Sequence, residues 1–208
     1  MKKIIYILTA LLLTSALYAA PKGAYIGLGY GNSDFADGGY QNDLNDVLRS
    51  AGSSVRIDDD YKDSATKVYA GYQFNRIIAL EASYTKFATL SLNATNQQKM
   101  ELDPSSLALT ANLGYSIGKD SLYRPFVLVG ISSVSIEKTG DIDDESKKKR
   151  SGLKLGIGFE YTPKELKGVG FRIAHETDIY VLEEDIDEKE NIYIQSLNLF
   201  YFGVSYKF

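Results

Sequence analysis

Apolar residues alternate with small or charged ones throughout one stretch, Leu153-Lys154-Leu155-Gly156-Ile157-Gly158-Phe159-Glu160-Tyr161. One parity holds leucine, isoleucine and aromatic residues, and the other holds glycine, lysine and glutamate. A period of two places successive side chains on opposite faces of a β-strand. The stretch therefore predicts a strand with one apolar face and one small or polar face.

Seven further segments share this period and predict strands near 24–31, 67–74, 80–85, 107–115, 125–136, 169–176 and 200–208. The segment 125–136 begins apolar on both parities, and we place Val127, Val129 and Ile131 outward and Gly130 and Ser132 inward. Short connections near residues 75, 119 and 164 alternate with long ones that span 32–64, 88–104, 137–150 and 178–190. Short turns at one end and long loops at the other are typical of a transmembrane barrel.

Tyrosine and phenylalanine gather at the ends of these segments, as in the aromatic girdles of such barrels: Tyr72, Phe74, Tyr115, Tyr123, Phe126, Tyr161, Tyr206 and Phe208. Lipid offers no hydrogen-bond partner to an open strand edge, so the ladder has to close on itself. Eight strands leave an interior just wide enough for side chains. We therefore predict an all-β fold, an eight-stranded antiparallel transmembrane β-barrel in an up-and-down meander.

The N-terminus has the features of an export signal. Lys2 and Lys3 precede an apolar run, Ile4 to Leu13, which small and neutral residues follow. The run is too short to span a bilayer as a helix, which needs roughly 20 apolar residues. We expect cleavage after Ala19, which makes 1–19 a signal peptide and 20–208 a single barrel domain.

Composition excludes several classes of function. Removing Lys2 and Lys3 changes the net charge from −4 to −6, and this argues against nucleic acid as a partner because phosphate binding needs a basic face. The chain has no cysteine, which excludes a disulfide scaffold and thiolate metal sites. With no phosphate-binding glycine loop and no histidine cluster, we expect no cofactor, no metal site and no enzyme activity.

The C-terminal run Phe200-Tyr-Phe-Gly-Val-Ser-Tyr-Lys-Phe208 resembles the terminal strand signal of outer-membrane proteins. The runs 70–75 and 79–84 resemble the second hairpin of small OmpA- and OmpX-type barrels, and Arg124-Pro-Phe126 leading to Gly130 resembles their fifth strand. The resemblance implies a monomer in the bacterial outer membrane, in contact with lipid and lipopolysaccharide. It also implies that the assembly machinery reads an insertion signal formed by Phe200, Phe202, Val204, Tyr206 and Phe208.

Charged residues of the inward parity are the first candidate site. They form an expected interior polar network of Lys67, Glu81, Lys154, Glu160, Arg172 and Glu176. A hairpin centred on residue 165 would place Lys154 opposite Glu176 and Glu160 diagonal to Arg172. Unpaired charges would be unfavourable in such an interior. The network is either a structural filling of the lumen or the gate of a narrow pore for small solutes.

The long connections hold two further candidates. The segment from Asn42 to Gly52 has apolar residues at helical spacing, a capping residue and a terminal glycine, which predict a short helix; a flexible loop is the alternative. Eight aspartates lie in 32–64 against three basic residues. This acidic surface is either simply solvated or shares divalent cations with lipopolysaccharide.

The sole histidine, His175, and Thr177 share the outward parity of one strand. This segment loosely resembles the histidine and serine region of lipid A 3-O-deacylases, in which a hydroxyl and a histidine act together. Threonine at the serine position weakens the resemblance. We expect a structural or surface-interaction role, with membrane integrity and loop-mediated adhesion or ligand contact. A narrow pore is the alternative function, and a lipid A-modifying enzyme is a remote one.

Overall fold

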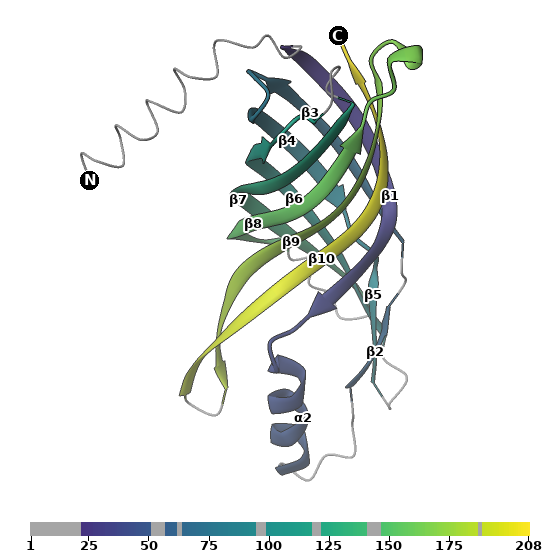
Figure 1. Ribbon diagram of the computed structural model, residues 1–208. Coiled ribbons are helices and arrows are strands. Elements are labelled where there is room, and N and C mark those ends of the chain that lie inside the picture. The colour runs from purple at the N-terminus through teal and green to yellow at the C-terminus, as the bar shows by residue number, and fades with distance from the viewer. Residues whose placement is uncertain are drawn as a thin grey trace, which may run out of the picture.

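The computed structural model describes residues 22–50, 57–61, 64–94, 99–117, 122–140, 147–186 and 189–208. The expected signal peptide, 1–19, lies outside these residues. The described residues form ten strands, and eight of them make the barrel: β1 (Gly23–Ala36), β3 (Ser64–Gln73), β4 (Ile78–Lys86), β6 (Lys99–Gly114), β7 (Tyr123–Gly140), β8 (Lys147–Tyr161), β9 (Val169–Ile186) and β10 (Lys189–Lys207). Each pairs antiparallel with the next, and β10 pairs with β1. The predicted closed meander of eight strands is confirmed (Figure 1).

The register gives the barrel a strong strand tilt. Starting at Ile26 on β1, the paired residues around the barrel are Ala70, Ala82, Leu109, Ile131, Leu153, Ile179, Ser196 and finally Ala36, again on β1. The row returns ten residues further along the same strand. A stagger of this size for eight strands requires the strands to tilt well away from the barrel axis.

Side chains alternate between the two faces as the sequence predicts. The outward residues form an apolar belt, whose members include Leu28, Val68, Leu109, Ile157 and Phe202, all exposed. Glycine, polar and charged residues of the other parity fill the interior. The outward assignment of Val127, Val129 and Ile131 on β7 is confirmed.

Aromatic residues do occupy the belt margin at the strand ends, with one exception. Tyr72, Phe74, Tyr123 and Phe208 are exposed on the outer face. Phe126, which the sequence placed in the girdle, is instead buried inside the barrel. It has the inward parity of β7, and its ring lies beneath the guanidinium of Arg172, 4.9 Å from it. Proximity to a segment end was therefore a weaker guide than parity.

The expected long loops are largely strand. β9 ends at Ile186 and β10 begins at Lys189, so strand covers most of the expected connection 178–190. Likewise, β7 ends at Gly140 and β8 begins at Lys147, within the expected connection 137–150. The sequence missed these extensions because both faces of a strand beyond the membrane contact water, so the alternation of polarity fades while the backbone pairing continues. Figure 1 shows β9 and β10 continuing as a long hairpin.

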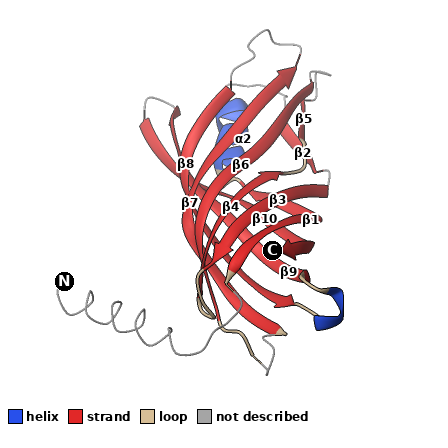
Figure 2. Cartoon of the chain, turned by 90° about the horizontal axis from the view of Figure 1, so that it is seen from above, coloured by secondary structure: helices blue, strands red, loops and turns tan. Residues whose placement is uncertain are grey.

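The first long connection holds a helix, α2 (Tyr40–Ser50), as predicted, although it begins two residues before Asn42. Gly38 and Gly39 precede it with positive φ angles of 68° and 95°, a conformation that glycine adopts without strain. Figure 2 shows α2 within the outline of the strand ring. Two short strands, β2 (Ile57–Tyr61) and β5 (Leu90–Ala94), extend the sheet from β6 at the same end. In the described parts of the chain, no helix combines the length and the apolar content needed to cross a membrane.

Candidate functional site

The centre of the barrel holds a two-pronged ion pair between β9 and β4. Arg172 donates from Nη1 to Oε1 of Glu81 at 3.0 Å and from Nη2 to Oε2 at 2.8 Å. Tyr25 donates its hydroxyl to Glu81 Oε2 at 2.9 Å, and the Arg172 guanidinium lies over the Tyr69 ring, 4.0 Å from its centroid. Planar, bidentate pairing of this kind is the strongest geometry available to an arginine and a carboxylate.

Toward the extracellular end, the charges continue in alternating sign. Lys67 pairs with both Glu81 (3.4 Å) and Glu176. Lys154 then pairs with Glu176 at 3.3 Å and with Asp178 at 2.6 Å. Ser106 donates to Asp178 at 3.0 Å. Every member of this part is almost fully buried, so each charge depends on its partners rather than on water.

Toward the periplasmic end, Glu160 joins two arginines. Arg172 Nη2 lies 2.6 Å from Glu160 Oε1, and Arg124 Nη1 lies 3.0 Å from Glu160 Oε2. Arg124 also donates to the backbone carbonyl of Asn112 at 3.2 Å. Four cations and four carboxylates thus form one neutral chain, which we call the interior network: Lys67, Glu81, Arg124, Lys154, Glu160, Arg172, Glu176 and Asp178.

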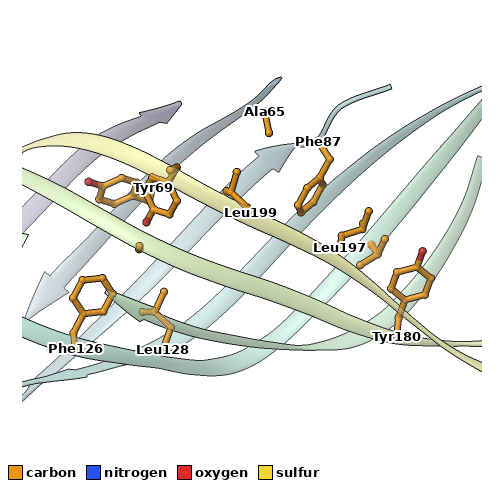
Figure 3. Packing of buried hydrophobic residues seen from close by; sticks show 11 residues of the cluster. Ala65, Tyr69, Phe87, Phe126, Leu128, Tyr180, Leu197 and Leu199 are labelled. Atoms are coloured by element: carbon orange, nitrogen blue, oxygen red, sulfur yellow. The ribbon is translucent and has the colours of Figure 1, made fainter. Parts of the chain in front are cut away.

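A layer of mainly apolar side chains lies on the extracellular side of Asp178. Tyr180 is the next inward residue of β9, and Leu197 is the register partner of Asp178 on β10. These two pack with Phe87 and Val134 in one buried cluster. Figure 3 shows Phe87, Leu197 and Tyr180 at one end of this cluster and Tyr69 and Phe126 at the other. Side chains from strands on every side therefore fill the lumen in two successive layers.

The structure brings together all six of the predicted interior residues, but with a different pairing. Lys154 lies opposite Asp178, with Glu176 diagonal to it, and Glu160 lies directly opposite Arg172. The expected register was wrong because the hairpin is centred on residue 166. The β8–β9 turn contains a short 3₁₀ helix, η2 (Lys164–Leu166), followed by Lys167 and Gly168 with positive φ. The connection is two residues longer than the expected one, so each β8 residue pairs two positions further along β9.

Two charged members and three tyrosines were missed. Asp178 was assigned to a loop because the strand was ended too early, although it continues the inward parity of Arg172 and Glu176. Arg124 was considered only within the run Arg124-Pro-Phe126, which resembles a fifth strand. Its parity is the inward parity of Gly130, which was the signal for an interior position. Three tyrosines contact the network: Tyr25 and Tyr201 donate hydrogen bonds to its carboxylates, and the Arg172 guanidinium lies over the Tyr69 ring. Their inward parity was the signal that could have identified them.

His175 and Thr177 lie side by side on the outer face of β9. The Thr177 hydroxyl donates to the side-chain oxygen of Asn198 on β10 at 2.9 Å. Within the described part of the chain, the His175 imidazole forms no hydrogen bond. The two side chains therefore do not make a nucleophile–base pair in this structure. A catalytic pair requires hydrogen-bond reach between them.

Helix α2 is attached to the extracellular extension of β10. Tyr193 donates its hydroxyl to Asp43 at 2.8 Å, and its ring meets Tyr40 edge to face at 5.3 Å. Gln195 donates to the backbone carbonyl of Asp37 at 3.4 Å. Burial of the ring and the bond to Asp43 raise the pKa of Tyr193 to about 12. The helix is therefore held over the barrel mouth by specific contacts.

The insertion residues Phe200, Phe202, Val204, Tyr206 and Phe208 all lie exposed on the outer face. β10, which carries the first four, is hydrogen-bonded to β1 on one side and β9 on the other. Phe208 follows the last strand residue, and its backbone N–H donates to the carbonyl of Ala24 at 2.9 Å. Their side chains are thus available to lipid and contribute to the belt.

The sequence profile of the outer membrane protein β-barrel domain matches residues 5–208. The chain belongs to this outer-membrane β-barrel family. It is accordingly a bacterial outer-membrane protein, and the predicted location and OmpA-like family are confirmed. No curated protein matches the sequence itself at a significant level.

Among solved structures, the barrel is similar to Ail, the attachment invasion locus protein of Yersinia pestis, with a TM-score of 0.55, 14% identity, and coverage of 91% of this chain and 100% of Ail. OprG of Pseudomonas aeruginosa gives a TM-score of 0.54, 12% identity, and coverage of 89% and 96%. Neisserial surface protein A gives 0.51, 16% identity, and coverage of 89% and 97%. At these identities the likeness extends to the fold of this outer-membrane barrel and no further.

Proposed function

We propose that this protein is a closed outer-membrane barrel whose interacting surface is its extracellular end. The observation that supports this most directly is the filled lumen. The interior network is neutral and internally paired, and the apolar layer of Phe87, Val134, Tyr180 and Leu197 lies across the lumen beyond it. A solute path would have to separate buried ion pairs, which is strongly unfavourable. A pore therefore stands as the second function, to be judged by conductance.

The extracellular end is well suited to binding because side-chain contacts hold its helix and its hairpin together. The β9–β10 hairpin extends beyond the belt, and α2 is held against it through Tyr193 and Asp43. Such loops and extensions on a rigid scaffold commonly carry binding function. The proposed role needs no cofactor or metal, and no enzyme activity. Membrane support by the belt accompanies this role.

A segment of four consecutive basic residues, Lys147 to Arg150, begins β8 at the extracellular end. Lys148 and Lys149 are exposed. Ail was solved in complex with a heparin analogue, sucrose octasulfate, which is a dense polyanion. We propose that this basic segment binds an anionic glycan, either a sulfated chain outside the cell or the phosphorylated sugars of lipopolysaccharide.

Binding of heparin and of purified lipopolysaccharide to the detergent-folded barrel tests this proposal. Each basic residue near an anionic surface contributes about 1 kcal/mol, so Lys148→Gln/Lys149→Gln should weaken binding roughly 30-fold. The variant Lys22→Gln/Lys167→Gln removes the same charge at the periplasmic end and serves as the control. Equal binding by all three proteins would contradict the proposed site. Binding of only one of the two glycans identifies the source of the anion.

The N-terminal residues 1–19 are proposed as the signal peptide that directs export. The C-terminal residues from Phe200 to Phe208 are proposed as the signal for the assembly machinery. Both proposals concern delivery to the outer membrane and are separable from ligand binding, because they act before the barrel is closed.

A further inference from the structure

The outer face of β9 and β10 carries a polar layer inside the apolar belt. On β9, His175 pairs in register with Ile157 and Phe200, which are exposed members of the belt. The next outward residue, Thr177, bonds to Asn198 at 2.9 Å, and Asn198 pairs in register with Asp34 on β1. The polar layer therefore runs diagonally upward across three strands, from within the belt to its extracellular margin.

Acyl chains do not satisfy the part of this layer that lies within the belt. Acyl chains offer no hydrogen-bond donor or acceptor, and polar residues that face lipid are unfavourable and commonly mark a functional contact. Among the described residues, the His175 side chain has no hydrogen-bond partner, and the Asn198 side chain is bonded only to the Thr177 hydroxyl. The imidazole and most of the Asn198 amide thus retain unused donors and acceptors at this depth.

Above the polar layer, the same face is apolar, whereas the described outward residues of the other barrel strands at this end are polar, apart from Ala36 on β1. Val181 and Ile194 face each other across β9 and β10, and together with Ile192 they are 44%, 65% and 67% exposed. The pairing of β8 with β9 ends at Gly152 and Tyr180. At that level, β8 turns Ser151 and Lys149 outward, both exposed. The belt has therefore ended there, and the three aliphatic side chains lie outside the lipid.

We propose that this face binds the same face of a second copy of the chain, about a twofold axis along the membrane normal. All copies insert in one orientation, so a twofold axis along the membrane normal places equivalent residues of the two copies at the same depth in the membrane. It brings the polar layer of one copy against the polar layer of the other, and the apolar patch of Val181, Ile192 and Ile194 against its counterpart. A twofold interface uses one surface patch on both subunits. The face then has a polar partner within the belt and an apolar partner above it.

The pairing with a second copy goes beyond the proposed glycan binding and replaces the monomer expected from the sequence. A lipid ligand would account for the polar layer alone, because the aliphatic patch lies above the acyl chains. A second copy accounts for both layers at once. Histidine, threonine and asparagine each donate and accept, so the part of the polar layer on β9 and β10 is complementary to itself, whereas Asp34 on β1 only accepts.

Cysteine cross-linking in native outer membranes tests the interface, because the chain contains no cysteine. Ser196 faces outward on β10, between Asn198 and Ile194, and its replacement leaves both layers intact. Ser196→Cys should give a disulfide-linked dimer on mild oxidation. Ser133→Cys, at an exposed outward position on β7, is the matched control and should stay monomeric. The two barrels should show the same heat-modifiable mobility on a gel.

A second variant separates a specific interface from random collision. Adding Ile194→Glu to Ser196→Cys should lower the dimer yield severalfold, to the level of the control, while folding is unchanged. Equal yields at positions 196 and 133 would overturn the proposal. If both variants stay monomeric, lipid covers this face; if both cross-link, the contact is collisional. An unchanged yield with Ile194→Glu would also overturn it.

Discussion

Arg172 and Glu81 form a bidentate ion pair across the barrel interior although they lie 91 residues apart in the chain. The pair joins β9 to β4 on the far side of the lumen, and Glu160 and Lys67 extend it in both directions. The two halves of the barrel wall are thus connected through the interior as well as around the circumference.

Replacing Glu81 with glutamine should destabilise the folded barrel by about 3–5 kcal/mol, because Arg172 and Lys67 would lose a buried counter-charge. Unfolding by urea in detergent or lipid vesicles measures the change. A double-mutant cycle with Arg172→Met should show strong coupling, so that the double variant is less destabilised than the two single effects combined. Additive losses would show that the bidentate pair contributes little.

Substituting Gly27 with alanine should also destabilise the barrel, here by overpacking of about 1–3 kcal/mol. A Cβ at this position would lie 2.2 Å from Cζ of the Tyr69 ring. The matched test is the double variant Gly27→Ala/Tyr69→Leu, which removes the ring that the methyl group meets. Recovery of part of the lost stability, measured by urea unfolding relative to Tyr69→Leu alone, is the expected result; no recovery would place the conflict elsewhere.

The wild-type protein should carry no steady ion current in planar bilayers. Both the interior network and the apolar layer would have to rearrange before ions could pass. Single-channel recording of purified, heat-modifiable protein is the measurement, with an empty bilayer and a known porin as references. A reproducible open level would favour the narrow pore over the closed barrel.

Alkaline pH should release helix α2 from the hairpin. Tyrosine titrates near 10 when free, and the pKa of Tyr193 is raised to about 12. The docked state therefore keeps its full stability below pH 10 and loses it as the pH rises through 12, where the phenolate would face Asp43. Subtracting the ultraviolet titration of Tyr193→Phe from that of the wild type isolates this group. A midpoint near 10 would contradict the buried, bonded geometry.

Removal of Phe208 should impair assembly in cells far more than stability in vitro. The side chain is 76% exposed, so its loss changes little packing in the finished barrel. Outer-membrane levels after expression and refolding yield in detergent are the two readouts. Phe202→Ala, on β10, provides a comparison in the belt. Parallel losses in both assays would indicate a structural role instead of a recognition signal.

The alternation of polarity was sufficient to predict the eight strands, their outward faces and the closure of the barrel. Parity also identified six of the eight charges of the interior network. The pairing was not predictable to the same degree, because a turn that is two residues longer moves every cross-strand partner by two positions, as at Lys154 and Asp178. The strand extensions were not predicted because both of their faces contact water beyond the membrane, so polar and apolar residues need not alternate there.

The apolar layer and the docking of α2 were beyond the reach of pattern reasoning. Leu197 lies on β10 and Phe87 directly follows β4, and their meeting depends on the stagger of the strands and not on any local signal. The bond between Tyr193 and Asp43 joins residues 150 apart. Such contacts follow only once the tilt and register of the whole sheet are known.

The ladder between β1 and β10, in which Tyr25 pairs with Lys207, joins residues near opposite ends of the part of the chain that the structure describes. Until it forms, the chain is an open, curved sheet with two unsatisfied edges, which cannot reside stably in hydrocarbon. Contacts of such sequence separation also form slowly, since chain entropy must be lost before they stabilise anything. Strands that entered the bilayer one at a time would leave their backbone groups without hydrogen-bond partners. We therefore expect the strands to assemble at the membrane surface and to insert together as the β1–β10 ladder closes the barrel.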